Sequence, residues 1–511
     1  TIEGYFAAQR RLPWPLAALS MVATTFAVDT PLAITEYVRE GGLAANWRWW
    51  NMLIGGMLSV VIFAPLWRRS GVLTDSEILT LRYGGKAAQI LRAIRAIWLG
   101  GVINLVILGW VQTAMLSVLK SFVGLEEKSA YLVLTLCTGV TLLYTLWGGL
   151  WSVVWTDVLQ LSLALTATSL LMIRVMYEVD LSEVPAQAWQ LLPGGDESEG
   201  GWLTLIALLG VQWWASWYPG AEPGGGGYIL QRMASTPSPH EAQKALALFQ
   251  LLHYAVRPAT WFSVALGSIL IFPHLEDSKS AYLLMAKRFL SPTEQVILLV
   301  GLAGAYMSTL STHFNWGASY VARDLGLREE IGLRIGLWAT LFLGIVSVGI
   351  TPFMHSVSGA WNFLLESGAG TGFVLLLRWF SGRISVWSEI VGMIAPLIGY
   401  GLFYGLLGWR FPHSYLATVG FTVTAVVLTM IIGKGTAIEQ WKAFKAQVKP
   451  HISLALAGIW MLGVCSGYGV LLGLLMWLRE GGMPVLLLTG GVGMGLFFWL
   501  LDREAKRETA A

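Results

Sequence analysis

The stretch "ALSMVATTFAVDTPLAITEY" (18–37) decides the fold, because it is apolar enough to cross a membrane yet cannot form one unbroken helix. Its middle holds two adjacent threonines and then Asp29, Thr30 and Pro31. Proline removes a backbone hydrogen bond, and the short polar side chains offer the chain local alternatives to helical bonds. A second stretch, "LLGVQWWASWYPGAEPGGGGYILQRM" (208–233), is interrupted in the same way. Irregular backbone at membrane depth is tolerated only where protein buries it or where it lines a cavity.

The composition indicates a membrane protein. The chain has 511 residues, of which 55% are hydrophobic and 12% are charged, whereas soluble domains carry roughly 25% charged residues. Apolar runs of the length that spans a bilayer as a helix recur along the whole chain. The net charge of +3 gives no indication of a nucleic-acid partner. No pairing of a nucleophile with a base and no metal motif suggests an enzyme.

The hydropathy pattern, in which Gly, Pro and charged residues mark the boundaries between apolar runs, predicts an all-α polytopic membrane protein with no soluble domain. Fourteen spans are expected near residues 13–38, 47–67, 87–119, 130–147, 151–177, 202–234, 243–272, 296–320, 331–352, 357–380, 386–408, 413–433, 452–478 and 483–502.

Positive charge predicts the orientation, because cytoplasmic connections carry an excess of Lys and Arg. Twenty-two basic residues fall on one side of the predicted spans and nine on the other. The richer side includes Arg10, Arg11, Arg232, Lys445 and Arg503. We therefore expect both ends of the given chain to face the cytoplasm.

The two interrupted spans are the first and the sixth. Breaks at corresponding positions of two halves are typical of a transporter built from an inverted repeat, with its binding site at the breaks. Each break also carries a carboxylate, Asp29 or Glu222, and ionisable groups inside a membrane usually serve a function. The alternative is that both breaks are packing kinks.

The eighth span, "AGAYMSTLSTHFNWGASYVARDL" (303–325), carries a stripe of hydroxyl groups at helical spacing. Ser308, Thr309, Ser311 and Thr312 supply four hydroxyls within five residues. Hydroxyls in membrane helices often bond to their own helix or join helices together. They also supply the oxygen ligands that hard cations prefer, and we favour this second interpretation.

Several blocks of the sequence resemble the sodium/solute symporter family. They are "YFAAQRRLPWPLAALSMVATTFA" (5–27), "LTLRYGG" (79–85), "YTLWGGLWSVVWTDVLQ" (144–160), "YILQRMAS" (228–235), "MSTLSTHFNWGASYVARDL" (307–325) and "LRWFSGRISVWSEI" (377–390). The blocks occur in family order.

The resemblance implies a ten-helix core of two inverted five-helix halves, with broken first and sixth helices, over residues 1–385. The halves would be about 13–177 and 202–380, and residues 386–511 would form about four peripheral helices. Family members usually have one more helix before this core, so such a helix is expected upstream of Thr1.

The resemblance also implies two sodium sites and no other cofactor. The first would use backbone carbonyls of Ala23, Phe26 and Ala305 with the hydroxyls of Ser308 and Thr309. The second would use Asp157, Ser308, Ser311 and Thr312. Asp157 lies eight residues past Gly149, or roughly 12 Å along a helix, which places it on the cytoplasmic side of the midplane. The alternative for Asp157 is a carboxylate capped by Thr156 or bonded to an Arg or Trp at the membrane interface.

The predicted function is sodium-coupled symport of a small polar organic solute into the cytoplasm. A sugar, an amino acid or an organic acid would fit. Aromatic walls with a few oriented charges are typical of such pockets, and the predicted pocket residues are Asp29, Thr30, Trp213, Trp217, Glu222 and Arg257. Other partners would be membrane lipids, in the inner membrane of a bacterium. Two alternatives remain at this stage, a proton-coupled carrier of the same fold and a non-transporting sensor or structural subunit.

Overall fold

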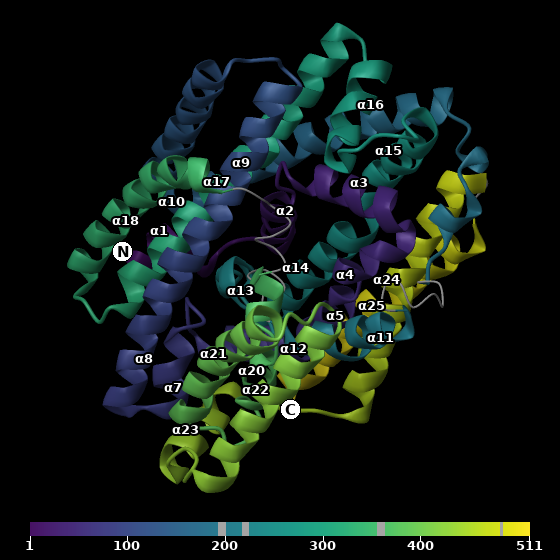
Figure 1. The fold of residues 1–511 in the computed structure, drawn as a ribbon. Coiled ribbons are helices and arrows are strands. Elements are labelled where there is room, and N and C mark those ends of the chain that lie inside the picture. Colours follow the sequence, from purple (N-terminus) through teal and green to yellow (C-terminus); the bar gives the residue numbers. More distant parts are fainter. Residues whose placement is uncertain (193–200, 217–223, 355–362, 481–483, 511) are drawn as a thin grey trace.

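The structure is a computed structural model that describes residues 1–192, 201–216, 224–354, 363–480 and 484–510. In this part of the chain the backbone is helical apart from connections and one isolated antiparallel bridge between Ser216 and Ala369. Figure 1 shows the helices gathered into one bundle.

The first part of the bundle contains α1 to α10. Their bounds are α1 (Ile2–Ala7), α2 (Trp14–Thr25), α3 (Thr30–Gly41), α4 (Trp47–Trp50), α5 (Met52–Leu58), α6 (Ala64–Ser70), α7 (Glu77–Tyr83), α8 (Gly85–Ile97), α9 (Asn104–Ser121) and α10 (Glu127–Glu178). Short π-helical segments, Ser59–Phe63 and Trp98–Ile103, continue α5 into α6 and α8 into α9.

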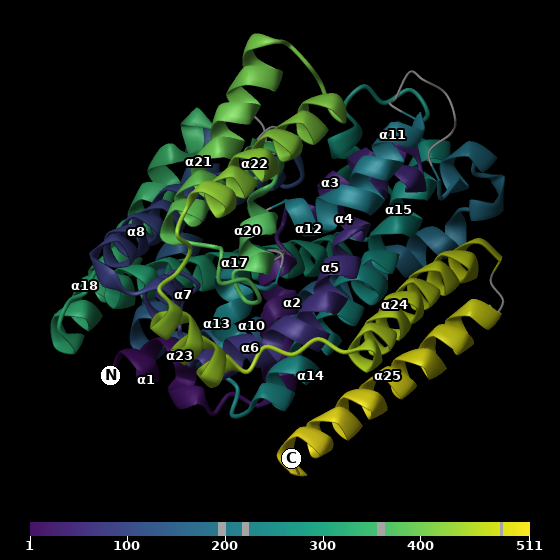
Figure 2. The ribbon, with the colours of Figure 1, turned by 90° about the horizontal axis from the view of Figure 1, so that it is seen from below.

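The remaining helices run from α11 to α25. Their bounds are α11 (Gly201–Ile206), α12 (Trp213–Ala215), α13 (Gly227–Ala234), α14 (Pro239–Leu251), α15 (Arg257–Ile271), α16 (Ala281–Phe289), α17 (Pro292–Asp324), α18 (Glu329–Ile350), α20 (Thr371–Leu377), α21 (Val386–Tyr400), α22 (His413–Ile432), α23 (Ile438–Val448), α24 (Leu454–Glu480) and α25 (Val485–Ala510). In Figure 2, α24 and α25 run side by side, and both ends of the chain lie in the lower part of the view.

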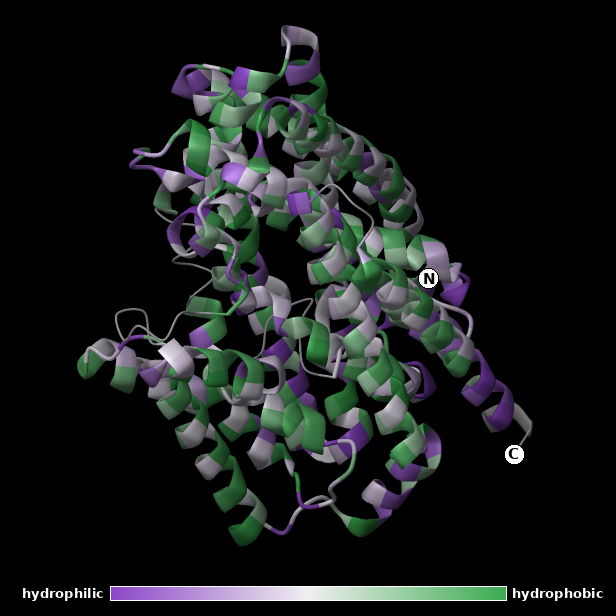
Figure 3. Cartoon of the chain, turned by 90° about the vertical axis from the view of Figure 1, so that its right-hand side faces the viewer, coloured by the Kyte–Doolittle hydropathy of each residue, from purple (hydrophilic) through white to green (hydrophobic). Residues whose placement is uncertain are grey.

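Among the described residues, ten helices are long and apolar enough to cross a membrane. The pair α2 and α3, bent by 60° at the break between them, makes an eleventh span if the two are counted as one. Large apolar side chains point outward from them, and Trp147 is 93% exposed and Ile432 81%. Lipid tails would cover such a surface, which is unfavourable in water. Figure 3 shows hydrophobic residues (green) predominating along the helices, with a hydrophilic tail (purple) at the C-terminus. The prediction of an all-α polytopic membrane protein is confirmed.

The count differs from the fourteen predicted spans for three local reasons. The predicted spans 130–147 and 151–177 share the single element α10. The predicted span 202–234 is divided among α11, α12 and α13, none of which is long enough to cross alone. The predicted span 357–380 lies partly outside the described residues, and α20 within it has seven residues.

A break at Gly149 divides α10 into two segments. A straight helix of its 52 residues would extend about 78 Å, more than twice a bilayer core of about 30 Å. Gly149 leaves helical geometry with φ 56° and ψ −143°. The Tyr5 hydroxyl lies within hydrogen-bond distance of the carbonyls of Thr145 (2.7 Å) and Leu146 (3.1 Å), just before the break. The predicted turn at the two glycines is therefore confirmed.

The predicted break in the first span is also confirmed. α2 ends at Thr25 and α3 begins at Thr30, with Pro31 in the first turn of α3, where a missing N–H is harmless. In the predicted sixth span, α12 ends at Ala215 and α13 begins only at Gly227.

Candidate functional site

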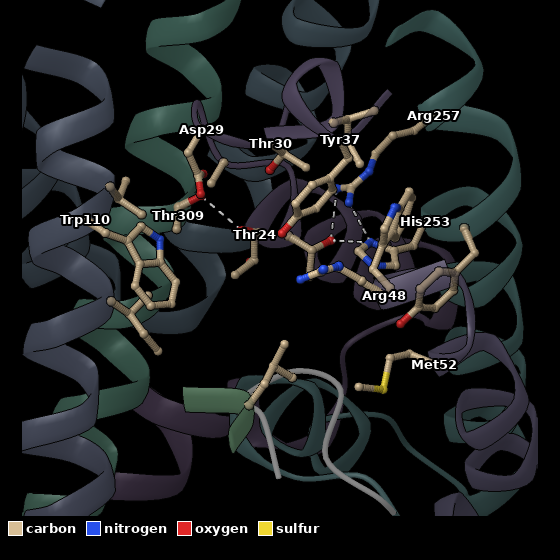
Figure 4. Close-up of a pocket in the computed structure, with 18 of the residues that line it drawn as sticks. Thr24, Asp29, Thr30, Tyr37, Arg48, Met52, Trp110, His253, Arg257 and Thr309 are labelled. Atoms are coloured by element: carbon tan, nitrogen blue, oxygen red, sulfur yellow. Dashed lines mark hydrogen bonds between the residues drawn. The ribbon is translucent and has the colours of Figure 1, made fainter. Parts of the chain in front are cut away.

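A cavity of about 180 Å³ lies beside the break between α2 and α3. Its wall combines charged and aromatic side chains from helices that are distant in sequence, as Figure 4 shows. The charged residues are Asp29, Arg48, Arg257 and Glu366, and the aromatic residues include Tyr37, Trp49, Trp110, Tyr228 and Tyr254. Such a wall suits a small polar solute.

Residues of the first predicted sodium site meet where α2 ends against α17. The Ser308 hydroxyl donates to the carbonyl of Ala23 (2.9 Å), and the Thr309 hydroxyl donates to the carbonyl of Thr24 (2.9 Å). Both hydroxyls also reach the carbonyl of Ala305, at 3.2 and 3.1 Å. The helical register of α17 thus brings two hydroxyls to carbonyls in the last turn of α2. The carbonyl of Ala23 also accepts the backbone N–H of Phe26 (3.1 Å), so it is shared between the end of its own helix and α17.

This oxygen cluster has the chemistry of a hard-cation site. The five predicted ligand residues are all buried. Phe26 follows α2 with φ −92° and ψ 69°, so its carbonyl is turned away from the helix direction. A hydroxyl keeps two acceptor lone pairs, and a small rotation redirects them to a cation. The carbonyl of Thr24 is an additional oxygen that the sequence did not predict.

Arg257, a predicted solute ligand, lines the cavity but also supports the break. Its Nη1 donates to the carbonyl of Val22 (3.2 Å) and to the hydroxyl of Thr25 (3.1 Å), and its Nη2 lies 2.7 Å from Nδ1 of His253. The guanidinium also lies over the ring of Phe26, 5.6 Å from its centroid. A cation that satisfies the last carbonyls of a helix stabilises that helix end. Arg257 therefore holds the end of α2 in place.

Asp29 and Thr30 both line the cavity, as the predicted pocket requires. Asp29 occupies the N-cap position of α3, yet its side chain makes no capping hydrogen bond. The residue is 3% exposed, and neither carboxylate oxygen has a hydrogen-bond partner among the described residues. In Figure 4, Asp29 lies on the same side of the cavity as Trp110 and Thr309.

Asp157 of the second predicted sodium site faces an arginine. Its Oδ2 accepts a hydrogen bond from the Ser20 hydroxyl (2.6 Å) and lies 3.8 Å from Nη2 of Arg232. The same Nη2 donates to the hydroxyl of Thr312 at 2.6 Å. The guanidinium therefore lies between two residues that were predicted to share a sodium ion. The Ser311 hydroxyl instead donates along its own helix, to the carbonyl of Ser308 (3.0 Å).

The charge pattern placed Arg232 among the cytoplasmic basic residues, and the structure corrects this, because the residue is fully buried. Arg232 follows the interrupted part of the sixth span, and α13 carries it back into the bundle against α2 and α17. The positive-inside rule applies to connections and not to a paired cation inside the bundle. Asp157 therefore faces an arginine, but inside the bundle and not at the membrane interface, where the alternative had placed such a pair.

Of the three remaining predicted pocket residues, the structure describes only Trp213. Trp213 is not part of the cavity lining, because its indole N–H donates to the carbonyl of Leu209 and its ring packs near Trp460 of α24. Trp217 and Glu222 lie outside the described residues.

Arg48 is the main cavity residue that sequence reasoning missed. It belongs to "WRWW" (47–50), whose tryptophans suggested only an interfacial belt. The guanidinium lies over the rings of Phe411 (5.5 Å) and Tyr37 (6.0 Å). A cation surrounded by three tryptophans was the available signal, although such patterns are also common at membrane surfaces.

Comparison with known proteins gives a consistent result. A model of the sodium:solute symporter family matches residues 5–330. A sodium/glucose cotransporter from Vibrio parahaemolyticus is 24% identical over 475 residues, which cover 84% of each chain. Sodium/glucose cotransporter 1 from Oryctolagus cuniculus is 29% identical over 182 residues, 35% of this chain and 26% of that protein. A sodium/myo-inositol cotransporter from Canis lupus familiaris is 27% identical over 182 residues, 35% of this chain and 24% of that protein.

Two solved structures share the fold. A Na⁺-coupled sialic acid symporter in a substrate-bound, outward-open state superposes with a TM-score of 0.69 at 19% identity, over 86% of this chain and 93% of that one. A nucleobase-cation-symport-1 family transporter in a closed conformation superposes with a TM-score of 0.52 at 14% identity, over 86% of this chain and 97% of that one. At these identities the likeness concerns the fold alone.

Proposed function

The chain belongs to the sodium:solute symporter family, and from that premise we propose that it carries sodium and a small polar organic solute together into the cytoplasm by alternating access. Members of this family are transporters with sodium as the coupling ion, so this chain is a transporter and not an enzyme, as its motifs predicted. It is an integral membrane protein. The location of the proposed site, its solute and the direction of transport are our inferences.

The observation that carries the proposal is the pair of hydrogen bonds from Ser308 and Thr309 to the carbonyls of Ala23 and Thr24. We place the coupling sodium there, with Ala23, Phe26, Ala305, Ser308 and Thr309 as ligands. A sodium ion at this position would replace hydrogen bonds with ion–oxygen contacts and join the break of α2 to α17.

Sodium and solute would be coupled because their sites share residues. Thr24 and Thr309 line the solute cavity and also take part in the oxygen cluster. Ordering of these residues by sodium would prepare the cavity for the solute, and the solute must then tighten sodium binding by the same factor. One elementary charge that crosses a potential of 100 mV provides about 2.3 kcal/mol, which is sufficient to drive accumulation of the solute.

Sodium binding at the second predicted site would require Arg232 to move. The guanidinium bonds to Thr312 and faces Asp157, and a cation in the same space would be repelled by it. We propose that this second site, with Asp157, Ser308, Ser311 and Thr312, binds sodium only in a state in which Arg232 has withdrawn.

The proposed orientation has both ends of the chain in the cytoplasm of a bacterial cell, with the protein in the inner membrane. The excess of basic residues on one side supports this arrangement. Sodium and solute would enter from the opposite side and leave toward the ends of the chain.

Sodium-dependent thermal stabilisation of the purified protein tests the proposal even while the solute is unidentified. Ligand that binds the folded state raises the free energy of unfolding by RT ln(1 + c/Kd), where c is the sodium concentration, and therefore raises the melting temperature. Potassium replaces sodium in the reference buffer. We expect Ser308→Ala and Thr309→Ala to weaken the sodium affinity roughly tenfold or more.

Ser319→Ala is the matched control on the same helix. The Ser319 hydroxyl is buried but donates to the carbonyl of Trp316 on its own helix, so its removal should leave sodium affinity unchanged. Equal sodium dependence in Ser308→Ala, Thr309→Ala and the wild type would refute the assignment. Solute uptake into proteoliposomes that is driven by a proton gradient without sodium would favour the proton-coupled alternative.

A further inference from the structure

We propose that the carboxylate of Asp29 binds an ammonium group of the transported solute, so that the solute is an amine-bearing compound and not a neutral polyol. The inference rests on the proposed function, because it names the class of solute that enters the same cavity.

The first argument is the placement of the carboxylate. Aspartate before a helix ordinarily accepts a hydrogen bond from a backbone N–H of the first turn. Asp29 precedes α3 in this position, yet it makes no capping bond and lines the cavity. Both oxygens are buried and without a hydrogen-bond partner among the described residues. A buried carboxylate in this state is unfavourable, and it is relieved either by protonation or by a bound group that supplies donors and positive charge.

The second argument concerns the cations of the same cavity. Arg257 is committed to the end of α2 through its bonds to Val22 and Thr25. The guanidinium of Arg48 lies over the rings of Tyr37 and Phe411. Among the described residues, no ion pair within 4.0 Å joins either arginine to Asp29, and Arg257 acts on this carboxylate only from a longer distance. The solute would therefore supply the positive charge that is in direct contact with Asp29.

The third argument distinguishes an ammonium group from hydroxyl groups. Hydroxyls of a neutral polyol would donate hydrogen bonds to Asp29 but leave its charge uncompensated inside the membrane. Hydrogen bonds to an ionised carboxylate are charge-assisted with either donor. An ammonium group differs because it also brings the positive charge that neutralises the buried carboxylate. Trp110, which Figure 4 places on the same side as Asp29, offers an aromatic face that also attracts a cation.

Matched pairs of solutes test the inference directly. Each pair differs only in its amino group: L-alanine and L-lactate, D-glucosamine and D-glucose, and propylamine and 1-propanol. The panel is widened with the remaining common amino acids and with putrescine. Thermal stabilisation of the full chain is measured in sodium buffer. We expect stabilisation by at least one amine-bearing compound, with an affinity roughly tenfold or more above that of its amine-free partner.

Asp29→Asn then assigns the preference to this residue. The substitution keeps the size of the side chain and removes a buried charge, so the variant should fold and retain the stabilisation by sodium alone. We expect it to lose the preference for the amine-bearing member of the pair. Asp180→Asn, which removes an exposed carboxylate far along the chain at the end of α10, should keep that preference.

The results separate this inference from the proposed function. Stabilisation by a neutral sugar that equals or exceeds that by its amino analogue overturns the inference while leaving sodium-coupled symport intact. Absence of stabilisation by every amine-bearing compound of the panel also overturns it. An unchanged amine preference in Asp29→Asn overturns the role of Asp29. Loss of the response to sodium alone in the wild type would instead count against the proposed function.

Discussion

Asp157 and Arg232 form a fully buried pair that joins the helices around the proposed sodium pathway. The carboxylate Oδ2 lies 3.8 Å from Nη2 of the guanidinium, and both side chains are 0% exposed. The Ser20 hydroxyl connects them, because it donates to Asp157 at 2.6 Å and accepts from Nε of Arg232 at 3.2 Å. This relationship connects α2, α10 and α13, and Thr312 extends it to α17.

Removal of one partner of this pair should destabilise the protein strongly. Arg232→Gln leaves the carboxylate of Asp157 buried without a cation, for which we expect a loss of about 3–5 kcal/mol in the free energy of unfolding. The double variant Arg232→Gln/Asp157→Asn removes both charges and should recover part of the loss. Melting temperatures of the two single variants and the double variant in detergent measure the coupling. Purely additive losses would show that the two charges do not interact.

Sodium titrations should distinguish the first predicted site from the second. With Arg232 in place, the described conformation has one available cluster of oxygen ligands, so Thr312→Ala should leave sodium affinity nearly unchanged while Ser308→Ala lowers it. The measurement is the sodium Kd of each variant, obtained by fitting the rise of the melting temperature with sodium concentration. A loss in Thr312→Ala as large as that in Ser308→Ala would mean that the second site binds sodium in the ligand-free protein.

The break at Gly149 should not accept a side chain. A Cβ there would lie 2.5 Å from the carbonyl oxygen of Tyr5, and the positive φ is unfavourable for other residues. We expect Gly149→Ala to cost about 1–3 kcal/mol. Gly139→Ala is the control within α10, since its added Cβ meets no atom within 4 Å and alanine favours the helix by roughly 0.5–1 kcal/mol. The prediction fails if both variants melt at the temperature of the wild type.

Glu389 should be essential for attaching α21 to the bundle. Its carboxylate accepts from the Tyr83 hydroxyl (2.9 Å) and lies 3.4 Å from Nη1 of Arg95 and 3.5 Å from Nη1 of Arg378. All four residues are buried. Glu389→Gln removes the charge that faces two buried guanidinium groups, so we expect a loss of about 3–5 kcal/mol, measured as a fall in melting temperature.

An exposed carboxylate provides the comparison for Glu389. Glu439 pairs with Lys442 at 3.3 Å, but its side chain is 87% exposed. Glu439→Gln should change the free energy of unfolding by no more than about 0.5 kcal/mol. If Glu389→Gln is equally mild, α21 is a peripheral helix in energetic terms, as the predicted boundary near residue 385 implies. If the loss is large, α21 belongs to the same cooperative unit as the core.

The sequence by itself determined the features that depend on neighbours along the chain. Lipid requires every backbone polar group to be satisfied within a span, so long apolar runs predicted helices. Proline and short polar residues at 24–31 predicted the break after α2, and the two glycines at 148–149 predicted the break in α10. Helical spacing alone placed the hydroxyls of Ser308 and Thr309 in the hydroxyl-rich stripe of α17.

The tertiary structure decided which distant groups meet. Arg232 is 75 positions from Asp157 in the chain, and nothing local in "YILQRM" shows that α13 returns the guanidinium to the bundle interior. Trp213 was expected in the pocket but packs near Trp460, whereas Arg48 was not expected there and lines the cavity. The reason is the same, because the orientation of a helix about its axis depends on its neighbours.

Asp29 and Asp157 show the difference between what the sequence determines and what the tertiary structure determines. Both are carboxylates in apolar sequence, and the sequence identified both as costly and therefore significant. Packing then gave Asp157 an arginine and left Asp29 without a hydrogen-bond partner among the described residues, at the wall of a cavity. A buried charge requires compensation, but only the three-dimensional arrangement determines whether the protein or a ligand supplies it.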